Sequence, residues 1–395
     1  MRVKRLIYLF ITTIILAGCM DIKEIQNQNY VMAIGADYQD GKFFAYAQMV
    51  DFTAVAKTEG RSEEPTIYVA KGEGPTSFDA FIDLYNTTQE SVIWSHVTAI
   101  VLSEEALKKG FDYVMDGMVR YQEYRLTPWV FGTRDPIEDI FKVGGFYNQS
   151  PLDTILHNPN ELYEQNSEIK PMKLYKFASQ VYEPSYTVSL PSITINKTQW
   201  ETQKKKEPKL AYDGAFFIQN EHYKGFFTTE DIKGHRWITP QARQIPILVP
   251  SEKEPQFLIM AEDPSVKITP NKSFDNKQVT LEFKANAGIL NRPGKEISKT
   301  TGKEITNLQD MQKASEEAIK KEIMNLHQLG SKEGIDFFNV AHTYYRDFPS
   351  EWKQLSKSEK EALKNRLQVE NIKVKVDIKT SGSLRNKGVD VHKID

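Results

Sequence analysis

Residues 66–141 alternate between two hydrophobic periodicities, and this alternation restricts the fold more than any other feature of the chain. Strand-like apolar runs at 66–70, 97–102 and 127–132 are each followed by a segment with helical spacing. Strands that alternate with helices favour parallel pairing, because each helix returns the chain to the edge of the sheet where the previous strand began. We therefore predict a partly parallel sheet with helices packed on it.

Two of the predicted helices carry further signals. The helix that begins near residue 75 has large apolar side chains at positions i, i+3, i+4 and i+7, which share one face of a helix: Phe78, Phe81, Ile82 and Tyr85. The next helical segment contains Gly110, which predicts a break between two helices.

The flanking regions predict antiparallel hairpins and a second α+β unit. Residues 30–38 and 42–51 are strand-like and are joined by the turn Gln39-Asp40-Gly41. A second hairpin is predicted at 214–218 and 223–227, and further strands near 257–260, 266–268 and 279–283. A long helix near 308–329, ended by Gly330, precedes a final strand near 371–380 with strictly alternating apolar and charged residues.

The polar segment 196–209 carries four lysines before Pro208 and is the clearest linker candidate. We interpret its lysine run as a solvated loop rather than a lipid-binding patch. The predicted organisation is a removed leader at 1–18, an N-terminal domain at 19–200 and a C-terminal domain at 201–395. The patterns leave open whether the N-terminal half is one domain or two. The predicted class is α+β, with several domains built on mixed sheets flanked by helices.

The N-terminus indicates export and lipid attachment. Arg2, Lys4 and Arg5 precede a 12-residue apolar stretch at 6–17, which is long enough for a signal peptide and too short to span a membrane. It ends in Ala17-Gly18-Cys19, two small residues before the single cysteine of the chain. We predict cleavage before Cys19, which becomes the N-palmitoyl, S-diacylglycerol cysteine, so that two or more acyl chains anchor the protein. The alternatives are an uncleaved anchor or a secreted protein with a free thiol.

Composition and motifs give no sign of catalysis or of nucleic-acid binding. The chain has 51 basic and 53 acidic residues, and without the three basic residues of the leader the ratio is 48 to 53. This balance lacks the electropositive footprint of a nucleic-acid binder. Seven scattered histidines show no metal-ligand spacing, and Gly72-Glu73-Gly74-Pro75 indicates a turn, not a phosphate-binding loop. We predict a protein that is not an enzyme and has no cofactor and no metal.

Four blocks in order along the chain resemble the Ger(x)C family, the C-subunit lipoproteins of spore nutrient-germinant receptors. The first block is Gly18-Cys19-Met20-Asp21-Ile22-Lys23-Glu24-Ile25, followed by Ala33-Ile34-Gly35-Ala36-Asp37. The second is Trp94-Ser95-His96 with Leu102-Ser103-Glu104-Glu105-Ala106, Gly110 and Arg120, and the third is Asp213-Gly214-Ala215-Phe216-Phe217 with Gly225, Glu230, Gly234 and Trp237. The fourth is Gly334-Ile335-Asp336-Phe337-Phe338 with Arg346, Pro349, Trp352 and Lys353. The chain departs from the family pattern at Met20, where tryptophan is usual, and at Phe338-Asn339.

The resemblance implies an α+β fold and a non-enzymatic subunit on the outer face of the spore inner membrane. It implies assembly with the membrane-spanning A and B subunits of a receptor that triggers germination. The alternative is an extracytoplasmic solute-binding lipoprotein that captures the germinant itself, with two similar lobes around a polar cleft. A third hypothesis, an envelope hydrolase, predicts a cleft with perturbed titratable groups.

Cys19 is the one residue to which the sequence assigns a function. Trp94, Trp237 and Trp352 are interpreted as core residues, because tryptophan buries a large area. His96 is predicted to satisfy a buried hydrogen bond. Gly214, Gly225 and Gly234 are interpreted as requirements of backbone geometry and not of ligand approach.

Overall fold

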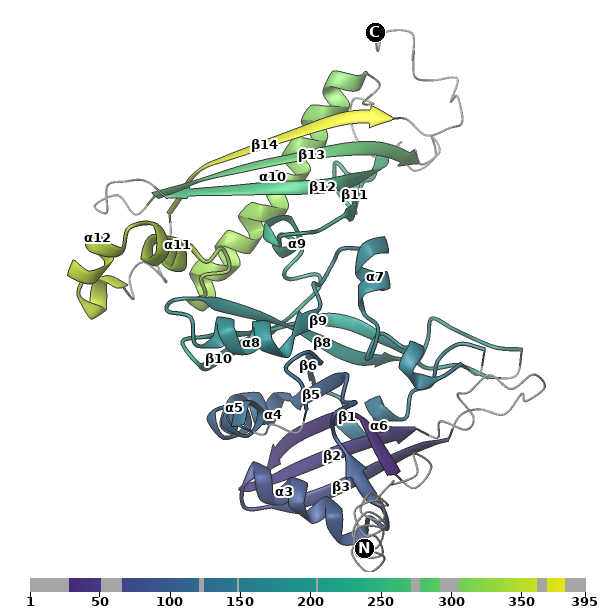
Figure 1. Ribbon diagram of the computed structural model, residues 1–395. Coiled ribbons are helices and arrows are strands. Elements are labelled where there is room, and N and C mark those ends of the chain that lie inside the picture. Colours follow the sequence, from purple (N-terminus) through teal and green to yellow (C-terminus); the bar gives the residue numbers. More distant parts are fainter. Residues whose placement is uncertain are drawn as a thin grey trace, which may run out of the picture.

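The computed structural model describes residues 28–50, 66–120, 124–147, 149–203, 205–270, 278–291, 305, 307–360 and 368–380. Two mixed sheets, stacked one above the other in Figure 1 and each covered by helices, form an α+β fold of the predicted class. The predicted leader and Cys19 lie outside the described residues.

The first sheet has ten strands, and its main path runs β10-β9-β8-β6-β5-β1-β2-β3. Its central neighbours β1, β5, β6 and β8 are parallel, as the alternation predicts, and the outer strands pair antiparallel. The strands are β1 (Gln28–Gln39), β2 (Lys42–Val50), β3 (Ile67–Gly74), β4 (Ser91–Ile93), β5 (Ala99–Ser103), β6 (Trp129–Thr133), β7 (Met172–Lys173), β8 (Thr187–Asn196), β9 (Lys209–Gln219) and β10 (His222–Thr228).

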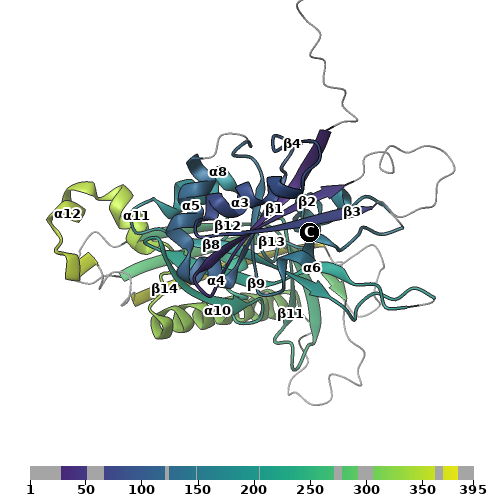
Figure 2. The same ribbon diagram turned by 90° about the horizontal axis from the view of Figure 1, so that it is seen from below.

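Helices cover both faces of this sheet (Figure 2). On one face lie α3 (Ser77–Asp83), α4 (Glu104–Lys109), α5 (Phe111–Arg120) and α8 (Leu174–Val181), and on the other lies α6 (Ile137–Phe141). Gly110 separates α4 from α5, as predicted. Alternate residues of β5 serve the two faces: Ile100 and Leu102 pack under the first group of helices, and Ala99 and Val101 pack under α6.

The second sheet has four strands in the order β11-β12-β13-β14. They are β11 (Gln244–Val249), β12 (Phe257–Pro270), β13 (Gln278–Asn291) and β14 (Gln368–Thr380). The long α10 (Leu308–Glu333) crosses one face of this sheet (Figure 1) and buries Met311, Ile319, Ile323 and Leu326 against it. The shorter helices are α7 (Asn160–Gln165), α9 (His235–Ile238), α11 (Val340–Asp347) and α12 (Pro349–Gln354).

The structure corrects two predicted boundaries in this half. The runs at 257–260 and 266–268 belong to one long strand, β12, which a register shift interrupts. The long helix does not end at Gly330; it continues to Gly334, which adopts the left-handed conformation (φ 67°) at the C-cap. Gly330 lies inside the helix. A glycine is needed there because a Cβ would lie 2.6 Å from the carbonyl oxygen of Ile335, where the chain folds back after the helix.

The lysine-rich segment 196–209 is a hairpin connection and not a linker between sheets. It joins β8 to β9, which pair antiparallel along their length, and the predicted hairpin β9–β10 extends the first sheet. Phe216 of β9 packs in the core of the first sheet, and its neighbour Phe217 packs in the core of the second. The strand β9 therefore contributes side chains to both cores. The division into an N-terminal and a C-terminal domain at residue 200 stays a prediction.

Candidate functional site

The three tryptophans are buried, as predicted. Trp94, Trp237 and Trp352 are 3%, 2% and 7% exposed. Trp237 donates its indole N–H to Glu322 on α10 at 2.6 Å, and Trp94 donates to the hydroxyl of Tyr85 at 2.7 Å. All three side chains belong to hydrophobic cores.

The prediction for His96 is wrong, because this side chain is exposed and its ring packs edge-on against Tyr30. The buried histidine is His157, whose Nε2 lies 3.0 Å from Gln48 Oε1 and whose Nδ1 lies 2.6 Å from the hydroxyl of Thr98. Both partners are at least 59 positions away from His157 in the sequence. The residues next to His157 in the sequence therefore give no indication that its side chain is buried and hydrogen-bonded.

The apolar stripe predicted on α3 exists, but the helix buries its other side. Thr76 caps α3, and Ala80 and the C-cap residue Leu84 are buried in the core. Of the predicted stripe, Phe81 is partly buried against the same core. Phe78 and Ile82 are 48% and 47% exposed. α3 lies close on β3 because Gly72 and Gly74 leave room for its backbone: a Cβ at Gly72 would lie 2.3 Å from the carbonyl oxygen of Ala80. The predicted turn at these glycines is therefore the end of a strand.

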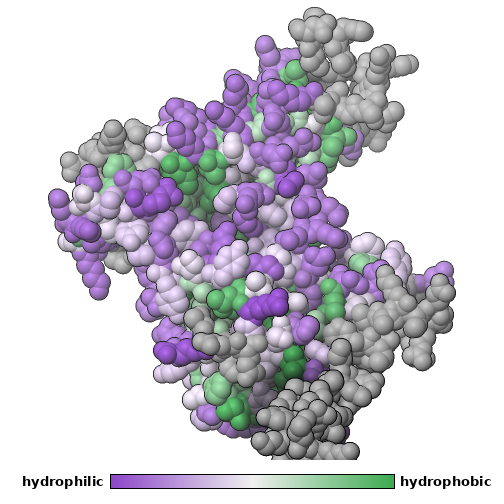
Figure 3. Space-filling view, in the orientation of Figure 1, coloured by the Kyte–Doolittle hydropathy of each residue, from purple (hydrophilic) through white to green (hydrophobic). Residues whose placement is uncertain are grey.

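We define the α3 face as the four large side chains that remain exposed on α3, its following turn and the neighbouring α5: Phe78, Ile82, Tyr85 and Tyr113. The hydroxyl of Ser77 donates to the carbonyl of Tyr113 at 3.1 Å and holds the two helices together. Figure 3 shows several separate hydrophobic patches on this side of the molecule, one of them in the lower part, where α3 lies. Single exposed apolar residues are ordinary, whereas a contiguous group marks an interaction surface.

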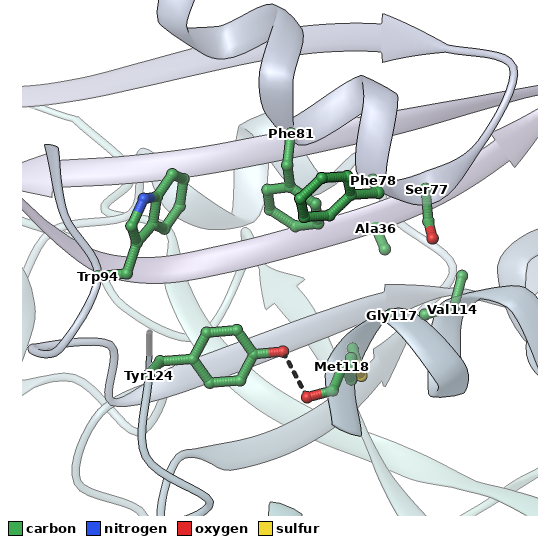
Figure 4. A pocket seen from close by; sticks show the side chains of 9 residues that line it. All are labelled: Ala36, Ser77, Phe78, Phe81, Trp94, Val114, Gly117, Met118 and Tyr124. Atoms are coloured by element: carbon green, nitrogen blue, oxygen red, sulfur yellow. Dashed lines mark hydrogen bonds between the residues drawn. The ribbon is translucent and has the colours of Figure 1, made fainter. Parts of the chain in front are cut away.

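A small apolar cavity of about 30 Å³ lies beneath this face, between α3 and α5 (Figure 4). Phe78 and Phe81 of α3 approach it from one side, and Trp94 and Tyr124 from the other. The Tyr124 hydroxyl donates to the carbonyl of Met118 at 2.9 Å, which occupies its polar atom. Ligand pockets enclose roughly 300–1,000 Å³, so this cavity has no room for an amino acid or a sugar.

The α3 face lies beside the point where β1 begins. Residues 28–30 of β1 pair in parallel with residues 91–93 of β4. Trp94 follows β4 directly and bonds to Tyr85 of the α3 face. Carboxylates stand around this face: Asp83 on α3, and Asp112 and Asp116 on α5, of which Asp116 pairs with Arg120. The surface is therefore apolar with an acidic margin.

Three of the perturbed titratable groups, His157, His235 and Asp336, have structural roles. Burial lowers the pKa of His157 to about 3 and that of His235 to about 4. Burial raises the pKa of Asp336 to about 6, although its carboxylate accepts a hydrogen bond from the backbone N–H of Ala341 at the start of α11. None of these three groups lines the cavity beneath α3, and within the described residues no cluster of histidine and acidic side chains has the geometry to bind a metal ion.

Comparison with known proteins gives the family. Residues 21–195 match the model described as the spore germination protein N-terminal domain, and residues 213–390 match the model described as spore germination B3/GerAC like, C-terminal. The chain belongs to the Ger(x)C family of spore germination proteins. The resemblance inferred from the four sequence blocks is thereby confirmed.

Individual relatives are distant but match over much of the chain. Spore germination protein KC of Bacillus subtilis (strain 168) is 20% identical over 364 residues, which is 88% of each protein. Spore germination protein A3 of the same organism is 25% identical over 226 residues, 55% of each protein. A crystal structure of the GerBC protein covers 91% of this chain and is itself covered to 99%, with 15% identity and a TM-score of 0.46.

The family is like the C subunit of spore germinant receptors, and the protein has a spore-related function. Among the residues that the structure describes, no helix is long and apolar enough to cross a membrane.

The sequence revealed the apolar stripe of this Ger(x)C protein but not the exposure of its side chains. Gly72 and Gly74, at alternate positions of β3, were the available signal for this exposure. They allow α3 to approach the strand through its small residue Ala80, which leaves the large side chains of the helix on the outside.

Proposed function

We propose that this Ger(x)C protein is the lipid-anchored subunit of a spore nutrient-germinant receptor. Cys19 carries the N-palmitoyl and S-diacylglycerol groups and holds the protein on the outer face of the spore inner membrane. There it assembles with the membrane A and B subunits and promotes germination without catalysing a reaction. The observation that carries this proposal is the pair of family matches, which together extend from two residues after Cys19 to residue 390.

The α3 face is the surface by which the protein docks on those subunits. Eight residues separate Cys19 from Gln28, the first residue of β1, and the nine steps of an extended chain from Cys19 to Gln28 span about 30 Å. The anchor therefore keeps the α3 face, which lies beside the start of β1, close to the membrane. The acidic margin favours a partner segment that is apolar with basic flanks.

The geometry does not favour the solute-binding alternative. That hypothesis predicts two similar lobes around a polar cleft. The two sheets are not similar: the first has ten strands with a parallel centre, and the second has four strands. The enclosed cavity beneath α3 is apolar and has a volume of about 30 Å³. A larger open cleft of about 970 Å³ is lined only by residues between 67 and 209, so it does not lie between two lobes. Calorimetry of the whole protein against amino acids and sugars distinguishes the two, since micromolar binding would support direct capture of the germinant.

Co-purification from spore membranes tests the proposal. A tagged wild-type protein is expected to remain with the membrane and to bring the A and B subunits with it. Cys19→Ala is expected to lose membrane retention and to delay nutrient germination. The control is germination by dodecylamine or another agent that bypasses nutrient receptors, which should be unchanged. Full retention and full nutrient response in Cys19→Ala would contradict the anchoring role.

A further inference from the structure

A second surface lies at one edge of the first sheet, where the loop after α6 meets the β8–β9 hairpin. It is an open cleft of about 970 Å³, lined by residues of the segments 139–151 and 195–209 and by Ile67, the first residue of β3. We define the basic cleft by six of its side chains: Lys142, Tyr147, Lys197, Trp200, Lys205 and Lys209. Three carboxylates, those of Asp139, Glu201 and Glu207, also line it and are outnumbered by five lysines. α6 packs on the opposite face of the sheet from α3, so the basic cleft and the α3 face are separate surfaces.

A buried lysine fixes the two walls of the cleft to each other. Lys209, at the start of β9, is 9% exposed, and its Nζ donates to the carbonyl oxygen of Gly145 at 2.7 Å and pairs with Glu207. The same ammonium lies 4.5 Å from the centre of the Phe146 ring. Trp200 packs edge-on against Phe146 with ring centres 4.9 Å apart. Two loops about 55 positions apart in sequence therefore form one preorganised surface.

The outer rim of the cleft presents aromatic rings and lysines to solvent. Tyr147 is 90% exposed and has a left-handed backbone (φ 55°), and Trp200 is 48% exposed. Lys142 pairs with Glu138, and Lys206 pairs with Glu201. Lys197 and Lys205 make no ion pair with any carboxylate of the described residues. The sequence alone led us to interpret this lysine run as a solvated loop; the structure adds the aromatic rings that lie beside it.

The strand register places this cleft at the end of the sheet where the chain arrives from Cys19. Ile67, which lines the cleft, pairs with Val50 at the end of β2. The preceding residue of β2, Met49, pairs with Val31 near the start of β1. Adjacent strands are about 4.8 Å apart, so the cleft begins about two strand spacings from β1. The eight residues between Cys19 and Gln28 limit the distance of the cleft from the anchor.

We propose that the basic cleft binds the anionic phospholipid headgroups of the membrane in which the Cys19 lipid is inserted. Exposed tyrosine and tryptophan settle at the level of the headgroups, and nearby lysines attract phosphate. The Cys19 lipid holds the protein at the membrane, and a basic surface beside it adds attraction to anionic lipid that orients the protein. The contact orients the protein with the α3 face free for its partners. This inference rests on the proposed anchoring by Cys19.

Hydrogen exchange of the lipidated full-length protein on vesicles tests the proposal. The vesicles are phosphatidylcholine alone, or phosphatidylcholine with one part in three of phosphatidylglycerol. Backbone amides around Tyr147 and Trp200 are expected to exchange at least about tenfold more slowly on the anionic vesicles, since each lysine near such a surface contributes appreciably to binding. High salt is expected to remove this protection, because it screens exposed charges.

The double variant Lys197→Glu/Lys205→Glu is expected to lose the protection on anionic vesicles. The matched control, Lys224→Glu/Lys313→Glu, makes the same change of charge at two exposed lysines outside the cleft and should keep it. Unchanged exchange in β5, a buried central strand of the first sheet that contains none of these four lysines, shows that both variants are folded.

Three results would overturn the proposal: equal exchange on neutral and anionic vesicles, protection that survives the reversal of Lys197 and Lys205, and protection on neutral vesicles caused by soluble glycerol phosphate. The last would identify a site for a free anion. Failure of the anchoring proposal looks different, because the wild-type protein would then not stay on either kind of vesicle. A protein that stays on both without local protection refutes only the lipid contact.

Discussion

Truncating the α3 face is expected to weaken assembly with the membrane subunits. The variant is Phe78→Ala/Ile82→Ala, which removes two side chains that are 48% and 47% exposed. Full burial of a phenylalanine or isoleucine side chain stabilises a complex by roughly 1.5–3 kcal/mol. About half of each side chain is available to a partner, so the double variant should lose about 2 kcal/mol of binding. This corresponds to a dissociation constant about 30-fold higher.

The assay is a binding titration of the purified lipoprotein against detergent-solubilised A and B subunits. Two controls separate binding from folding. Leu84→Ala removes a side chain that is 5% exposed beneath the same helix; it should cost about 2–5 kcal/mol of stability and leave binding unchanged below its melting temperature. Leu290→Ala truncates an exposed leucine on β13 of the second sheet and should affect neither.

The reasoning predicts a specific pattern across these variants. Binding must fall for the α3-face variant and stay near wild type for Leu84→Ala, even though the second protein is the less stable of the two. If all variants bind like wild type, the α3 face is not the docking surface. If binding follows stability, Phe78 and Ile82 act only through folding.

Three further predictions concern stability and can be measured by urea unfolding. Glu322→Ala should cost about 3 kcal/mol, because Arg236, which is 5% exposed and bonds both oxygens of Glu322 at 2.9 and 3.1 Å, keeps only the more distant carboxylate of Glu168 at 3.9 Å; a midpoint equal to wild type would contradict this. The depressed pKa of His157, about 3 when folded, means that this residue contributes stability above pH 6.5 that is lost as pH falls toward 3; His157→Gln should flatten that decline, and an equally steep acid transition would refute the assignment. Gly214→Ala should cost about 1–3 kcal/mol, since its Cβ would lie 2.0 Å from the carbonyl oxygen of Phe227, and a fully stable variant would show that the β9–β10 pair can separate there.

Local patterns were sufficient for most secondary structure. The hairpin at residue 40 follows from Asp40 and Gly41, which both take positive φ (49° and 84°) as a tight turn requires. The apolar stripe of α10 is buried as its spacing predicts. The alternation in the last strand also holds: Ile372, Val376 and Ile378 are buried in β14. Each of these features depends on neighbours within a few residues.

Membership of a sheet was not readable from the same patterns. A polar, lysine-rich stretch between two apolar runs describes a linker and a hairpin loop equally well. The pairing of β8 with β9 distinguishes them, and it depends on backbone hydrogen bonds between whole strands. The helix end at Gly334 and not Gly330 is a similar case, because the choice depends on where the following chain returns to pack.

Residue patterns alone predict the family, the class of fold, the anchor at Cys19 and the apolar stripe on α3. That this stripe is half exposed follows from packing, because the depth to which α3 sits on the sheet depends on Gly72 and Gly74 of β3. Only the tertiary structure brought Tyr147 beside Trp200 and the lysines of the β8–β9 hairpin. A surface is made by residues distant in sequence, so its composition follows from packing and not from periodicity.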